Sequence, residues 1–201
     1  MNLNYLSNKE GVLRAFTFFK ERYAEKPSIF TDGTSIKPMP SELYVNKEIT
    51  VGGGKVSLLI GSTDNEIGVT NFDGNKLEEG RAFAIDGIGF HLAIADSKTK
   101  PYNVDFSKGL SGADRKAFQF AILTIRQKNE VIASLPISSI LNGQENTYNK
   151  YRDIDLSLIE PKTKVEIEIE FPEEVEAPTL ADGKAVFVST VYRGYETYQK
   201  R

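Results

Sequence analysis

The sequence KVEIEIEF at residues 164–171 alternates strictly between apolar and charged side chains. In a β-strand successive side chains point to opposite faces, so the apolar residues of this stretch share one face and the glutamates share the other. Strict alternation is typical of an antiparallel sheet with one face on a core and one face in water. The apolar face carries Val165, Ile167, Ile169 and Phe171, and the charged face carries Glu166, Glu168 and Glu170.

Further strand-like runs occur on both sides of this segment, and no helical pattern recurs between them. The set of eight or nine strands therefore predicts an all-β fold, an antiparallel β-sandwich. The long loops 96–115 and 141–152 favour a jelly-roll or Greek-key connection over a tight meander. The other predicted strands are residues 48–51, 55–60, 65–72, 81–95, 117–127, 130–135, 153–158 and 184–195.

Turn-forming residues predict how some of these strands connect. The triple glycine at residues 52–54 lies between two short strands and predicts a hairpin. Lys128-Asn129 predicts a second hairpin. Gly87 and Gly89 indicate a bulge or bend within the strand 81–95. Apolar residues on both sides of the strand 117–127 predict that this strand is central and buried on both faces.

An amphipathic helix is predicted near the amino terminus, over residues 8–24. Ser7 and Glu10 form a capping-box pattern ahead of an apolar series. Residues 1–45 are predicted to form this helix and an extended, proline-bearing arm, followed by a single sandwich domain at 46–201. The apolar stripe of this helix consists of Val12, Phe16, Phe19 and Tyr23, and we predict it as an interface. It either covers the chain's own sheet or docks on a neighbouring subunit.

Composition excludes several kinds of site. The 201 residues include 25 Lys plus Arg and 28 Asp plus Glu, which gives a net charge of −3 and no bulk positive field for nucleic acid. There is no Cys and one His, so thiol nucleophiles, Cys-ligated zinc and three-His metal sites are absent. No apolar run approaches the roughly 18 residues of a membrane span. We therefore predict that the protein is not an enzyme, binds no cofactor or metal, and has no membrane partner.

Two groups of residues are catalytic candidates. His91 lies on the strand face shared with Gly89 and Ala93, and no G-x-S-x-G elbow accompanies it, so a Ser-His-Asp triad is not supported. The ladder Glu166, Glu168 and Glu170 places carboxylates about 7 Å apart along a strand, which a carboxylate-pair hydrolase would require. A solvated sheet face produces the same pattern more often.

Two further groups of residues are binding candidates. Asx and Glu residues at 64–75 supply oxygen ligands for calcium, but their spacing fails the EF-hand pattern and suits turns. Tyrosines at strand ends and loops are candidates for stacking on sugars in a carbohydrate-binding module. These tyrosines are Tyr44, Tyr102, Tyr148, Tyr151, Tyr192, Tyr195 and Tyr198.

Three stretches carry a resemblance to a known family: RAFAIDGIGF at 81–90, VIASLPI at 131–137 and IEPKTKVEIEIEFP at 159–172. With the helix and arm before them, they resemble the jelly-roll capsid proteins of bacteriophages. The resemblance implies a non-enzymatic structural subunit of the virion, assembled in the host cytoplasm. Its implied partners are other copies of itself and other virion proteins, with indirect contact to the packaged genome. The alternatives are a carbohydrate-binding sandwich and a carboxylate-pair hydrolase.

Overall fold

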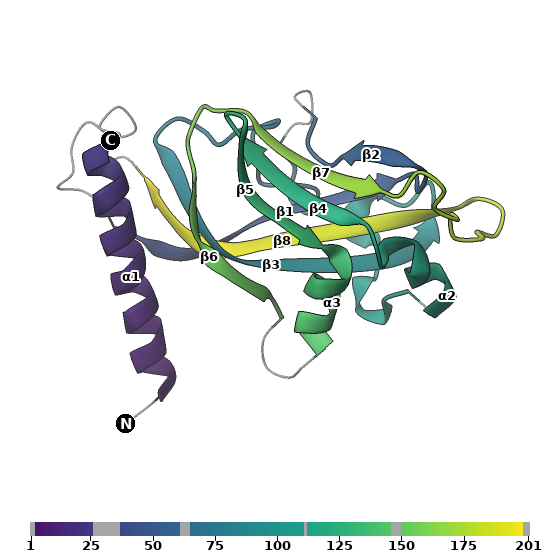
Figure 1. The fold of residues 1–201 in the computed structure, drawn as a ribbon, viewed down its shortest axis with the longest axis horizontal. Helices are drawn as coiled ribbons and strands as arrows, with labels where there is room; N and C mark the ends of the chain where they lie inside the picture. The colour runs from purple at the N-terminus through teal and green to yellow at the C-terminus, as the bar shows by residue number, and fades with distance from the viewer. Residues whose placement is uncertain (1–2, 26–36, 61–64, 111, 146–149, 199–201) are drawn as a thin grey trace.

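The computed structural model describes residues 3–25, 37–60, 65–110, 112–145 and 150–198, and it contains two antiparallel four-stranded sheets (Figure 1). The predicted all-β antiparallel sandwich is thereby confirmed. Sheet A has the strand order β1-β8-β3-β6: β1 Met39–Ile49, β8 Lys184–Tyr198, β3 Arg81–Asp96 and β6 Arg152–Ile159. Sheet B has the order β2-β7-β4-β5: β2 Gly54–Ser57, β7 Val165–Phe171, β4 Ile122–Gln127 and β5 Glu130–Pro136.

Strand pairing follows a nested pattern. The first strand pairs with the last, the second with the seventh, the third with the sixth and the fourth with the fifth. Two further pairings, β3 with β8 and β4 with β7, join these pairs into the two sheets. Strands that are neighbours in sequence therefore fall mostly in different sheets, and the hydrophobic core forms between them.

The core is built from the inward-facing residues of both sheets. On β7 the alternation predicted from the sequence is confirmed, because each of its four apolar residues is at most 3% exposed. Phe118 lies just before β4 and joins the sheets, since its ring is 5.4 Å from that of Phe171 on β7 and 6.3 Å from that of Phe90 on β3. Burial of such side chains supplies the main favourable free energy of folding.

The triple glycine does not form the predicted hairpin. β1 pairs with β8 and β2 pairs with β7, so residues 52–54 carry the chain from sheet A to sheet B. Gly53 permits this crossing because a Cβ atom there would lie 2.3 Å from the carbonyl oxygen of Glu173. β1 also begins at Met39, within the segment predicted to be an arm, because its pairing with β8 extends from Met39 to Ile49.

Two local predictions are confirmed. Lys128 and Asn129 form the turn of the β4–β5 hairpin, and both have positive φ angles, 52° and 64°. Two consecutive left-handed residues are what a two-residue hairpin turn of the favoured type requires. The register of β3 shifts between Ile85 and Gly87, so the bulge predicted there is present.

The segment predicted as a strand at 65–72 instead covers the free edge of β1. It forms only isolated bridges among the described residues, and the Asn46 N–H donates to the carbonyl of Val69 at 2.7 Å. The Tyr44 N–H donates to Oδ1 of Asn71 at 2.9 Å. Because an uncovered edge strand pairs readily with other chains, this segment blocks edge-to-edge association through β1.

The strand predicted at 117–127 is shorter and less buried than expected. β4 begins at Ile122, after a 3-10 turn at Lys116–Phe118, and it is central in sheet B as predicted. Its outer face is open, because Phe120 just before it is 70% exposed and Ile122 is 39% exposed. No other layer covers sheet B at this point in the described part of the chain.

Helices occupy the ends of the sandwich and the links between strands. The loop predicted from residue 141 is in part helical, since the helix α3, Ile137–Glu145, follows directly from β5. The other helices are α1, Leu3–Glu25, and the single turn α2, Gly112–Arg115, with 3-10 turns at Pro101–Asn103 and Phe106–Lys108. Within the described ranges no helix is long and apolar enough to cross a membrane.

Candidate interaction surface

The helix α1 lies at one end of the sandwich and runs across the strand direction of sheet A (Figure 1). Phe19 anchors it, because its fully buried ring forms a small apolar cluster with Ala82 and Ala84 on the outer face of β3. Around this cluster lie the partly buried residues Phe18, Leu156, Leu158 and Tyr195. The helix therefore packs on the sheet of its own chain through a second apolar cluster, separate from the main core.

The helix is rotated relative to the predicted stripe. Of the four predicted interface residues, Phe19 is buried, Val12 is half-buried and Phe16 is 40% exposed, while the side chain of Tyr23 lies outside the described part of the structure. The prediction that Ser7 and Glu10 cap the start of the helix is also wrong. The helix already includes Leu3, so Ser7 lies inside it.

Small residues explain the rotation. Gly11 and Ala15 precede Phe19 at spacings of four, so all three lie on one helix face. A Cβ atom at Gly11 would be 2.1 Å from the hydroxyl oxygen of Tyr195, and Ala15 is fully buried. The helix approaches the sheet most closely where its side chains are smallest, and this brings Gly11 and Ala15, rather than Val12 and Phe16, toward the strands.

An ion-pair cluster lies beside this contact. Asp86, at the β3 bulge, is 6% exposed and accepts a 2.8 Å hydrogen bond from Nε of Arg193 on β8. Nη2 of Arg193 donates to Asp153 at 2.8 Å, and Nη2 of Arg14 on α1 lies 3.5 Å from the Asp86 carboxylate. A hollow of about 550 Å³ opens between α1 and the sheet next to these groups. Arg193 keeps the buried carboxylate paired, and the exposed Arg14 adds a longer ion pair that links α1 to the cluster.

Tyr151 extends the cluster toward β1. The guanidinium carbon of Arg193 lies 5.2 Å from the centre of the Tyr151 ring, and the Tyr151 hydroxyl donates to Glu42. Burial, together with the Glu42 carboxylate, raises the pKa of Tyr151 to about 12. Both sides of the cluster are thus engaged within the chain, and we assign it to holding α1, β6 and β8 together.

The face of α1 that points away from the small apolar cluster carries a stripe of exposed side chains. It consists of Lys9, Leu13, Phe16 and Lys20, and we call it the outer stripe. These positions are spaced by four, three and four residues, so they fall on one line of the helix. Leu13 is 55% exposed and Phe16 is 40% exposed. Two exposed apolar side chains between two lysines give the helix an apolar and basic outer surface.

His91 lies on the outer face of sheet A, as the strand alternation predicted. Its cross-strand neighbour on β8 is Ser189, and among the described residues no hydrogen bond joins the two side chains. Burial lowers the pKa of His91, and the charge of Lys150 lowers it further. The arrangement disfavours an imidazolium at this position.

We expect this lowered pKa to make stability depend on pH. The unfolded chain holds its His91 proton near the ordinary pKa of about 6.5, whereas the folded chain releases it at lower pH. The unfolded state therefore binds more protons in this window, and the free energy of unfolding falls as the pH falls from about 7 to about 5. Melting temperatures of the wild type and His91→Gln across this range test the expectation. The decline is smaller in the variant, and parallel curves would show that His91 does not contribute.

The glutamate ladder lies on the outer face of sheet B. Glu170 is 3.7 Å from Lys55 on β2, and Glu166 pairs with Lys164. Glu168 lies opposite Thr124 of β4. Two of the three carboxylates are therefore paired with lysines, Lys55 on β2 and Lys164 just before β7, as on a solvated face.

Two of the other predicted binding residues, Asn71 and Tyr192, serve the fold. Asn71 donates through Nδ2 to the carbonyl of Glu42 at 2.8 Å, so its side chain holds β1. Among the described residues, no group of three or more His, Asp or Glu side chains is placed to hold a metal ion, and Asp64 is outside them. Of the tyrosines, Tyr192 is fully buried and Tyr102 is 49% exposed. Tyr148 and the side chain of Tyr198 lie outside the described part of the structure.

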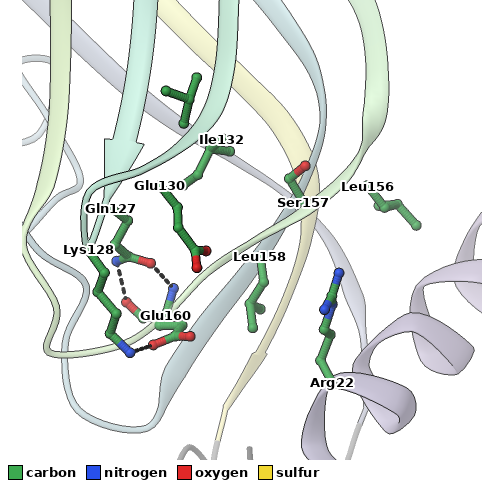
Figure 2. A pocket seen from close by; sticks show the side chains of 10 residues that line it. Arg22, Gln127, Lys128, Glu130, Ile132, Leu156, Ser157, Leu158 and Glu160 are labelled. Carbon is green, nitrogen blue, oxygen red and sulfur yellow. Dashed lines mark hydrogen bonds and ion pairs between the residues drawn. The ribbon is translucent and has the colours of Figure 1, made fainter. Parts of the chain in front are cut away.

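A second hollow, of about 160 Å³, lies between α1 and the β4–β5 turn (Figure 2). Gln127 closes its floor, since Nε2 donates to the carbonyls of Glu160 and Thr163 at 3.0 and 3.1 Å and Oε1 accepts from the Glu160 N–H at 2.8 Å. Lys128 pairs with the Glu160 carboxylate. These polar groups clamp the β6–β7 turn to the end of β4, so the hollow is part of the scaffold.

Comparison with known proteins identifies no relative, because no family model, no curated protein and no solved structure matches the chain.

Proposed function

We propose that this protein is a structural subunit that assembles with copies of itself into a virus particle, as a capsid or capsid-associated protein built on a jelly roll. Its partners are other copies and other virion proteins, and contact with the packaged genome is indirect. The particle is assembled in the host cytoplasm. The function of such a subunit is geometric, and its affinity comes from apolar surface buried between copies.

One observation carries the proposal, which is the strand order β1-β8-β3-β6 and β2-β7-β4-β5. An eight-stranded jelly roll is a double sheet made of two Greek keys, and viral capsid domains are among the proteins that use it. Nested pairing of the first strand with the last, the second with the seventh and so on supports this topology. The exposed apolar side chains of α1 and of the outer face of sheet B supply surface for contacts between copies.

The oligomeric state tests the proposal. Size-exclusion chromatography with light scattering, over a wide range of protein concentration, should give masses that rise above that of the monomer. Electron microscopy of the concentrated sample should then show rings, sheets or shells of regular size. A strict monomer at every concentration would overturn the proposal, and binding to a glycan array would then favour the carbohydrate-binding alternative.

A further inference from the structure

We propose that the outer stripe of α1 docks on the outer face of sheet B of a second copy, so that copies join head to tail. The inference rests on the proposed self-assembly and names the two surfaces that make the contact. It follows from the chemistry of two exposed patches and from their positions in the molecule.

The first surface is the outer stripe, with Leu13 and Phe16 between Lys9 and Lys20. The helix that carries it is held firmly from behind by Phe19 and by the ion pair of Arg14 with Asp86. A rigidly held helix loses little conformational entropy when its outer face is covered. The stripe is thus a preorganised apolar and basic ridge.

The second surface lies on the outer face of sheet B, where β4 begins and β7 ends. Phe120 is 70% exposed and Ile122 is 39% exposed, and Ile122 lies between Glu170 of β7 and Pro136 of β5. The patch continues into the exposed residues that follow β7. We call these residues the sheet B patch: Phe120, Ile122, Pro136, Glu168, Glu170, Pro172, Glu173 and Glu174.

The two surfaces are complementary in charge and alike in their apolar centres. The outer stripe is apolar with lysines at both ends. The sheet B patch is apolar with four glutamates around it, of which Glu170 is paired with Lys55 and the other three give the patch its negative charge. Contact of stripe with stripe would bring lysines together, and contact of patch with patch would bring glutamates together. Like charges at a contact are costly, so each surface prefers the other.

The positions of the surfaces make the contact intermolecular. α1 lies beside the β4–β5 turn, because Arg22 lines the same hollow as Gln127 and Lys128 (Figure 2). The sheet B patch lies at the other end of β4, toward α2 and away from α1 (Figure 1). One copy cannot cover its own patch with its own stripe. A contact between two different surfaces repeats from copy to copy and gives closed rings or open arrays.

Charge exchange tests the contact directly. One variant carries Lys9→Glu with Lys20→Glu, and the other carries Glu168→Lys with Glu170→Lys. The first variant presents an acidic stripe to an acidic patch, and the second replaces two of the patch's four glutamates by lysines, which removes the excess negative charge that attracts the stripe. Self-association of each variant should therefore weaken, about tenfold or more for the first. In an equal mixture, the unaltered basic stripe of the second variant meets the unaltered acidic patch of the first, so the two variants should assemble with each other at the wild-type strength. Sedimentation velocity of each variant and of the mixture measures this.

Controls change the charge by the same amount elsewhere. Lys98→Glu with Lys100→Glu and Glu78→Lys with Glu79→Lys alter exposed residues outside both surfaces and should leave association unchanged. Phe120→Ala truncates an exposed side chain and should weaken association while leaving the melting temperature nearly constant.

The outcomes distinguish a failure of the head-to-tail contact from a failure of the proposed self-assembly. Self-association at the wild-type level in both charge variants would overturn the head-to-tail contact while leaving self-assembly in place. Equal losses of association in the control variants would do the same. Failure of the mixture to assemble would also contradict the contact. A wild type that stays monomeric at every concentration would overturn the proposed function together with the contact.

Discussion

Phe19→Ala should undock α1 from sheet A while leaving the sandwich folded. Phe19 is the one fully buried large side chain in the small cluster with Ala82 and Ala84, and its removal leaves a cavity that these small residues cannot fill. Truncation of a buried phenylalanine costs about 3–5 kcal/mol. An isolated helix is marginal in water, so a helix that loses its anchor also unfolds. Hydrogen exchange of the α1 amides should therefore accelerate strongly while exchange in β3 and β8 changes little.

Phe16→Ala is the matched control for this prediction. Phe16 is on the same helix but is 40% exposed, so its truncation should change the exchange rates of α1 only slightly. The pair of variants separates the observed helix orientation from the orientation predicted by the apolar stripe. Equal acceleration in the two variants would show that Phe16 also faces the sheet and would contradict the orientation described here.

Gly194→Ala should destabilise the sandwich itself. Gly194 lies in β8 opposite Ile85 at the β3 bulge, and a Cβ atom there would be 2.1 Å from the carbonyl oxygen of Ala84. The obstacle is backbone in a central strand pair, so a side-chain rotation cannot relieve it. Overpacking costs about 1–3 kcal/mol, and a clash with backbone that cannot rotate away lies at the upper end of that range. For a protein of this size, that lowers the melting temperature by roughly 6–12 °C.

Gly52→Ala is the control for the glycine prediction. A Cβ atom at Gly52 would meet no other atom within 4 Å, and its backbone is not in the left-handed region. Its melting temperature should therefore stay close to that of the wild type. A Gly194→Ala protein that melts as the wild type does would show that β3 and β8 separate more easily at the bulge than the structure indicates.

Sequence periodicity predicted most of the strands because burial on one face imposes it. The alternation in β7, the hairpin at Lys128-Asn129 and the bulge at Gly87 each depend on a few neighbouring residues, so local reasoning suffices. The prediction of a hairpin at residues 52–54 was wrong because neighbouring residues do not decide the path of the chain there. Glycines indicate that the chain changes direction, and they do not specify whether it pairs back on itself or crosses to another sheet.

The helix surface was predicted only in part. The apolar stripe correctly included Phe19, but hydrophobicity alone gives Gly11 and Ala15 little weight. Close approach of the helix to Tyr195 and β3 selects these small residues, and that preference depends on a partner far away in sequence. The exposed Phe120 and Ile122 were missed for a similar reason, because two apolar faces on a strand predict burial on both sides unless the layers are known.

The nested strand pairing has a consequence for how the chain folds. The β4–β5 hairpin closes over a two-residue turn, whereas Ile49 at the end of β1 must find Val186 in β8. Closing a short loop costs less entropy than closing a long one, so pairing should begin in the middle of the chain and finish with its outermost strands. During synthesis on the ribosome, β1 would then remain unpaired until β8 has emerged, when nearly all of the described chain has been made.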